Sequence, residues 1–214
     1  MAFSKPANFI DIFKIGDNIN FNLSILKVLY DAYNNMPDGK LLIKSIIIIN
    51  TSITEAILYD FIENRIRKAN KTEKLFEEIL DVLRSKKLDK FAHYIVQAEK
   101  YDFFDMKNTE FYNAMNSLRK KRNRIHIQGH DWKKPKEVDE SNIFDEKSKI
   151  LSEKVLEKTI NTMISKYPRR KEYHEFVKDF QLPWEQHFPM ENIVEPKLTL
   201  NEARELGVIK TNAH

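Results

Sequence analysis

The feature that most constrains this chain is a long central stretch without helix breakers. Between Gly39 and Gly129 there is neither glycine nor proline, and all 214 residues include only 4 glycines and 7 prolines. Glycine and proline most often end helices and form tight turns, so this stretch predicts helices joined by short connections. Scarce glycine also disfavours a β-sandwich or barrel, because hairpin turns and bulges use it.

Apolar residues recur at helical spacing along most of the chain. We expect six helices and a short seventh, over Phe21–Asn34, Lys40–Ala69, Thr72–Lys86, Leu88–Tyr101, Asn108–Gln128, Lys149–Tyr167 and Arg169–Phe180. The second is apolar nearly all round, which is typical of a central or interface helix. The polar segment 129–147 is expected to be a long loop. The sequence therefore predicts an all-α helical bundle.

The end of the chain differs in composition from the helical part. Residues 1–181 are expected to form the helical domain, whereas three prolines break any long element in the arm 182–214. Within this arm, Thr199 and Glu202 form a capping-box pattern, and Gly207 follows at a spacing that would close a short helix. We therefore predict one domain and a proline-rich C-terminal arm.

Several functional classes are excluded by what the chain lacks. It has no cysteine, so disulfide scaffolds and zinc–thiolate sites are excluded, and no two glycines are close enough to form a phosphate-binding loop. The most apolar run, Leu41–Leu58, contains Lys44 and Glu55 and falls short of a membrane span. Residues 1–16 show no signal-peptide pattern. We expect a cytoplasmic protein without a cofactor and without membrane contact.

The clearest candidate site residues lie at the end of the predicted fifth helix. Five of the six residues from Arg119 to Arg124 are basic. At 100° per residue, Arg122 falls inside the apolar stripe of this helix, where an arginine requires an anion or acceptor. Arg119 and His126 lie together on one flank of the stripe. Lys120 and Arg124 are expected to face solvent.

These residue types suit the cleavage of RNA. An imidazole can take the proton from a ribose 2′-hydroxyl, and a guanidinium can hold the phosphate and stabilise the charge that develops on its oxygens. We expect His126 to act as the acid/base, Arg122 and Arg119 to clamp the phosphate, and Asn123 to orient either group. This chemistry needs no metal. A solvated basic face without catalysis is the alternative.

The string Leu-Arg-Lys-Lys-Arg-Asn-Arg-Ile-His, which begins at Leu118, resembles the signature of HEPN domains. The motif of that family is an arginine, four to six residues, and a histidine. The resemblance implies a four-helix core with extra helices and a homodimer in which two motifs face each other across a cleft. Active members are metal-independent endoribonucleases, many of them toxins or anti-phage effectors, and other members are non-catalytic.

The arginine of this motif has more than one candidate. Arg119 is separated from His126 by six residues, and Arg124 is separated from His130 by five. The arginine–polar dipeptide that is common in the family begins instead at Arg122. The sequence therefore leaves open which arginine pairs with the histidine.

The resemblance extends to the predicted second helix, because residues 46–61 are similar to the family's hydrophobic helix with an embedded acid. Glu55 shares a side of this helix with apolar residues, so we expect it to be partly buried and paired with a cation. Arg119 and Arg122 are the candidates. The pair would serve either as a structural ion pair or as support for an active site.

Three functional hypotheses follow. The first is a HEPN-like endoribonuclease that acts as a homodimer, with Lys120, Lys121, Arg124 and His130 as further RNA contacts. The second is a non-catalytic helical module that binds RNA or nucleotides or supports assembly. The third is a component of a toxin–antitoxin or defence complex whose partner supplies the activity. The all-round apolar second helix also favours the homodimer.

A metal site is not expected. His126 and His130 are four residues apart and Asp131 is adjacent, a spacing that could bind a metal on a continuous helix. Gly129 interrupts that helix, however, and no third ligand lies nearby in the sequence.

Overall fold

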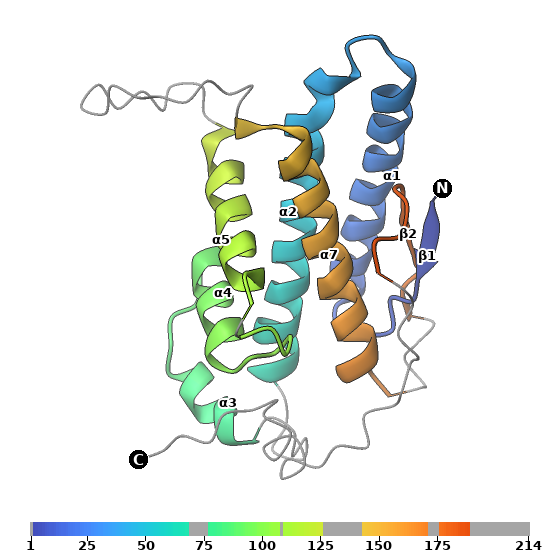
Figure 1. Ribbon diagram of the computed structural model, residues 1–214. Helices are drawn as coiled ribbons and strands as arrows, with labels where there is room; N and C mark the ends of the chain where they lie inside the picture. The colour runs from blue at the N-terminus through green and yellow to red at the C-terminus, as the bar shows by residue number, and fades with distance from the viewer. Residues whose placement is uncertain (1, 69–76, 108, 126–142, 171–175, 189–214) are drawn as a thin grey trace, which may run out of the picture.

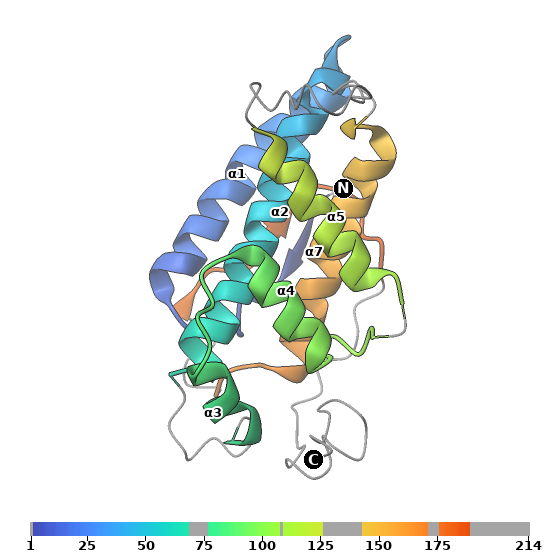
Figure 2. The same cartoon turned by 90° about the vertical axis from the view of Figure 1, so that its left-hand side faces the viewer.

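The computed structural model describes residues 2–68, 77–107, 109–125, 143–170 and 176–188. Four longer helices lie side by side in Figures 1 and 2: α1 (Phe13–Asn35), α2 (Ile43–Tyr59), α5 (Phe111–Arg122) and α7 (Glu146–Lys166). Two shorter helices are α3 (Glu77–Arg84) and α4 (Phe91–Lys100). The described chain is mostly helical, and the prediction of an all-α bundle is confirmed.

The central helix of the bundle is α2, which contacts α1, α4, α5 and α7. A 3₁₀ turn, Gly39–Leu42, precedes it, and a π-helical segment, Asp60–Ile66, continues it. This continuous stretch is long and apolar enough to cross a membrane, but half of its most apolar window is buried inside the bundle. Its neighbours on several sides explain why a helix that is apolar nearly all round suits this position.

Helix α1 begins at Phe13, well before the predicted start at Phe21. The carboxylate of Asp60, the first residue of the π-helical segment that continues α2, accepts a hydrogen bond of 2.6 Å from the backbone N–H of Asp11. The residue at the N-cap position, Ile12, makes no side-chain cap of its own. A carboxylate from a distant segment therefore accepts from a backbone N–H group at the start of α1. The local apolar periodicity of the sequence does not reveal such a cap.

A small antiparallel sheet joins β1 (Phe3–Lys5) to β2 (Phe180–Leu182). The prediction of helix up to residue 180 is wrong at its end. Phe180 and Leu182 are buried and Gln181 is exposed, which is the alternation of a strand. The boundary placed between residues 181 and 182 thus falls inside β2.

The last described residues dock on α7 through two buried carboxylates. Glu157 accepts hydrogen bonds from the backbone N–H groups of His187 and Phe188, both at 3.0 Å. Glu153 lies 2.8 Å from Nε2 of His187 and accepts a hydrogen bond of 2.6 Å from the hydroxyl of Tyr30. Residues 182–188 are therefore part of the bundle, whereas the short helix predicted in the arm lies outside the described residues.

Candidate functional site

The basic run closes α5, whose inward face is formed by buried residues: Phe111, Tyr112, Met115 and Leu118. The regular helix ends at Arg122, earlier than the predicted Gln128, and a 3₁₀ turn covers Asn123–Ile125. Arg124 leaves helical geometry, with φ −84° and ψ 25°. His126 and His130 lie outside the described residues. The structure thus describes the arginines of the candidate site and the residues up to Ile125, which precedes His126 in the chain.

An ion pair joins the end of α5 to α2. Nη1 of Arg122 donates a hydrogen bond to Oε2 of Glu55. The two side chains are 22% and 25% exposed, so the pair is largely shielded from water. This confirms the expectation that Glu55 is partly buried and paired with a cation. The structure assigns the pairing to Arg122, which the sequence left open between two arginines.

The surroundings of this pair fix the Arg122 side chain. Its guanidinium carbon lies 5.8 Å from the centroid of the Phe91 ring on α4, within cation–π range. Its Nε is buried and has no hydrogen-bond partner among the residues that the structure describes. Burial raises the pKa of the Glu55 carboxyl, and the adjacent Arg122 guanidinium offsets part of that increase. Arg122 therefore has its charge balanced and its position held from two neighbouring helices.

Arg119 lies one turn earlier and is held differently. Its Nε donates a hydrogen bond of 2.9 Å to Oδ1 of Asn116. Within the described part of the chain, no carboxylate pairs with its guanidinium. Arg119 is partly buried, whereas Lys120 and Arg124 are exposed, as their helical positions predict. Asn123 is also exposed, and its backbone N–H donates to the carbonyl oxygens of Arg119 and Lys121. Within the described residues its side chain makes no hydrogen bond to either arginine, so the orienting role predicted for it has no side-chain contact to support it.

Lys121 differs from the other basic residues of the run. Its Nζ donates a hydrogen bond of 2.6 Å to the carbonyl oxygen of Ile143 and another to the hydroxyl of Ser148. Asp145 caps α7 by accepting from the backbone N–H of Ser148 at 2.8 Å. Lys121 thus ties α5 to the start of α7, and these contacts use two of the three N–H donors of the ammonium group that the sequence assigned to RNA.

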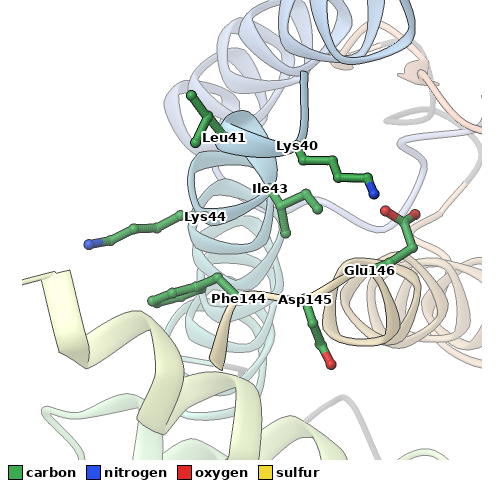
Figure 3. Close-up of a pocket in the computed structure, with 7 residues that line it drawn as sticks. All are labelled: Lys40, Leu41, Ile43, Lys44, Phe144, Asp145 and Glu146. Atoms are coloured by element: carbon green, nitrogen blue, oxygen red, sulfur yellow. The ribbon is translucent and has the colours of Figure 1, made fainter. Parts of the chain in front are cut away.

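A pocket of about 520 Å³ lies beside this junction, between the starts of α2 and α7. Figure 3 shows Lys40 extending toward Glu146, while Lys44 extends above Phe144. Nζ of Lys44 is 5.3 Å from the centroid of the Phe144 ring. The charge of Lys40 acts on Glu146 on the opposite wall, and Asp145 also lines the pocket. Sequence reasoning did not identify this pocket, since its two walls are about a hundred residues apart.

The described residues offer no group of three His, Asp or Glu side chains that could hold a metal ion. The arrangement at the end of α5 can bind an anion through guanidinium and ammonium groups. No protein-family model, curated protein or solved structure matches this chain.

Proposed function

We propose that this protein is a metal-independent endoribonuclease of the HEPN type, with its active site at the basic end of α5. The observation that carries the proposal is the difference between two arginines one turn apart. Arg122 is held by Glu55 and Phe91, whereas no other described residue bonds to the Nη atoms of Arg119. A fixed scaffold beside an available guanidinium, just before His126, suits the binding of a phosphodiester.

The reaction follows from these groups. The imidazole of His126 takes the proton of a ribose 2′-hydroxyl, and the 2′-oxygen attacks the adjacent phosphorus. The bond from phosphorus to the 5′-oxygen breaks, and that oxygen receives a proton from an acid or from water. The products are a 2′,3′-cyclic phosphate and a 5′-hydroxyl. The guanidinium of Arg119 stabilises the negative charge on the non-bridging oxygens.

A homodimer is part of this proposal. The surface that supports it lies on α1, on the other side of α2 from α5, so association through this surface alone would not set the two basic runs face to face as the resemblance implies. Helix α1 presents an apolar stripe on the side opposite its buried face, and Phe21 and Val28 are each 67% exposed there. Ile25 lies between them and is 37% exposed. A shallow groove of about 140 Å³ between α1 and α2 lies next to this stripe and is lined by Asn18, Ala56 and other residues. Exposed apolar side chains that gather in one patch often mark an interaction surface, so this stripe supports self-association.

A non-catalytic RNA-binding module is the second candidate, and a specific observation favours it. Two of the basic residues, Arg122 and Lys121, are already engaged with the protein itself. Arg119, Lys120 and Arg124 are enough to attract a phosphate backbone without any chemistry. A component of a toxin–antitoxin or defence complex, whose partner restrains or supplies the activity, is the third.

The deciding experiment incubates purified protein with labelled RNA in EDTA. We expect cleavage that leaves cyclic phosphate ends and a loss of roughly 100-fold or more in the variant His126→Ala, the range for a lost acid/base. His93 on α4, whose Nδ1 lies 3.2 Å from Oδ1 of Asp89, provides the matched control, and His93→Ala should cleave normally. Full cleavage by His126→Ala would reject the assignment. Binding without cleavage would favour the non-catalytic module.

A further inference from the structure

The two arginines near the end of α5 are not equivalent as ligands for a phosphate. Arg122 is already neutralised by Glu55, and the Phe91 ring lies beside it. A phosphate that bound Arg122 would have to displace this carboxylate. Glu55 would then lose its charge partner in a largely buried position, which is costly. Arg122 is therefore a poor site for an incoming anion.

Arg119 has the opposite properties. Its Nε–H is donated to Asn116, and the structure shows no carboxylate paired with it among the residues described. A guanidinium has five N–H donors, and among the described residues the four on its two Nη atoms have no partner, which leaves them for a ligand. One N–H from each Nη atom forms the planar fork that matches two oxygens of one phosphate.

We propose that Asn116 is a positioning residue, which holds Arg119 so that its Nη fork takes the scissile phosphate of RNA. Asn116 and Arg119 are three residues apart, so both project from the same face of α5. The hydrogen bond of 2.9 Å fixes the end of an otherwise flexible side chain before the substrate binds. Asn116 thereby supplies the orientation that the sequence assigned to Asn123.

This inference rests on the proposed ribonuclease function, and a double-mutant cycle tests it. We expect Asn116→Ala to lower kcat/KM about fivefold, because the guanidinium must then be ordered as the substrate binds. In the background of Arg119→Ala, the same change should have no further effect, since there is no guanidinium left to position. Asn116→Gln keeps an amide acceptor and should restore part of the activity.

Asn113 provides the matched control. It lies on the same helix and its amide contacts Glu110, so Asn113→Ala removes a similar hydrogen bond away from Arg119. We expect wild-type kinetics from this variant. Multiplicative losses in Asn116→Ala and Arg119→Ala would overturn the inference, because they would mean that Asn116 acts only through the helix. Wild-type activity of Asn116→Ala would overturn it as well.

A second measurement separates failure of this inference from failure of the proposed function. The same variants are titrated with a DNA oligonucleotide, which has no 2′-hydroxyl and is not cleaved. If wild-type protein leaves RNA intact, the ribonuclease proposal fails, while coupled losses of affinity in Asn116→Ala and Arg119→Ala still support the positioning. If Arg119→Ala binds the oligonucleotide as tightly as wild type, Arg119 holds no phosphate and the positioning role fails, even where RNA is cleaved.

Discussion

Arg122 donates a hydrogen bond to the carboxylate of Glu55, which joins the last turn of α5 to the central helix α2. Both side chains are about three-quarters buried. The pair fixes the end of α5 in the bundle, and with it the position of Arg119 and of the chain that leads to His126. Its removal should therefore affect stability first.

We expect Glu55→Ala to lower the free energy of unfolding by about 1–2 kcal/mol, because it leaves Arg122 partly buried without a counter-charge. A fully buried pair would lose more, but part of each side chain is exposed here. Urea denaturation measures the change. Replacing both partners, as in Glu55→Leu with Arg122→Met, should recover much of the loss. Unchanged stability of Glu55→Ala would contradict a structural role for the pair.

Asp60 should make stability depend on pH. It is 2% exposed, and burial raises its pKa to about 6 from an ordinary value of 3.8. Between these two values the folded protein binds a proton that the unfolded chain has lost. The contribution of Asp60 to the free energy of unfolding is therefore fully present below pH 4 and is lost as the pH rises through 6. The loss is at most about 3 kcal/mol.

The variant Asp60→Asn tests this sign, because its amide oxygen can still accept from Asp11 and carries no charge. Between pH 4 and pH 7, wild type should lose free energy of unfolding through Asp60, and Asp60→Asn should not. Relative to wild type, the variant should therefore be more stable at pH 7 than at pH 4. Other carboxylates titrate in this range, so the comparison is made between the two proteins at each pH. An equal difference at both values would refute the role of Asp60.

The basic residues at the end of α5 should separate into two groups by salt dependence. Lys120 and Arg124 are exposed, so the double variant with alanine at both should bind RNA more weakly. Its slope of log Kd against log salt concentration should be less steep by about 1.4, at roughly 0.7 for each lost phosphate contact. Lys121→Ala should keep the slope and lose stability, since its ammonium ties α5 to α7. A reduced slope in Lys121→Ala would place that residue on the RNA.

The exposed stripe of α1 predicts the oligomeric state. Light scattering at micromolar concentration should give wild-type protein a mass of twice 25.5 kDa. The double variant Phe21→Asp with Val28→Asp should be a monomer, because the two substitutions place charges in the centre of the apolar stripe. Val96 on α4 is 56% exposed and away from the stripe, so Val96→Asp should stay dimeric. A wild-type monomer would reject the homodimer.

Gly16 should tolerate no side chain. A Cβ at this position would lie 2.5 Å from Cγ1 of Val177, which packs on α1. We expect Gly16→Ala to lower the free energy of unfolding by about 1–3 kcal/mol through overpacking. Adding Val177→Ala removes the methyl groups involved and should restore part of the loss, as thermal unfolding can show. Equal stability of Gly16→Ala and wild type would contradict this prediction, because it would mean that the segment with Val177 moves away from α1 without a loss in free energy of unfolding.

The sequence predicted those features that depend on local spacing. A breaker-free stretch and an apolar repeat near 3.6 residues were sufficient for the all-α bundle and for the central position of α2, because helix formation and amphipathicity are local properties. The same repeat placed Arg122 on the buried side of α5 and Glu55 on a partly buried side of α2. It also placed Lys120 and Arg124 toward solvent.

Tertiary structure decided which groups meet. The choice of Arg122 over Arg119 as the partner of Glu55, the anchoring of Lys121 at α7 and the capping of α1 by Asp60 all join residues far apart in the chain. The strand at Phe180 likewise depends on β1, at the other end of the described chain. Such pairings minimise the cost of burying charges and backbone groups in one particular packing, and no local repeat encodes that packing.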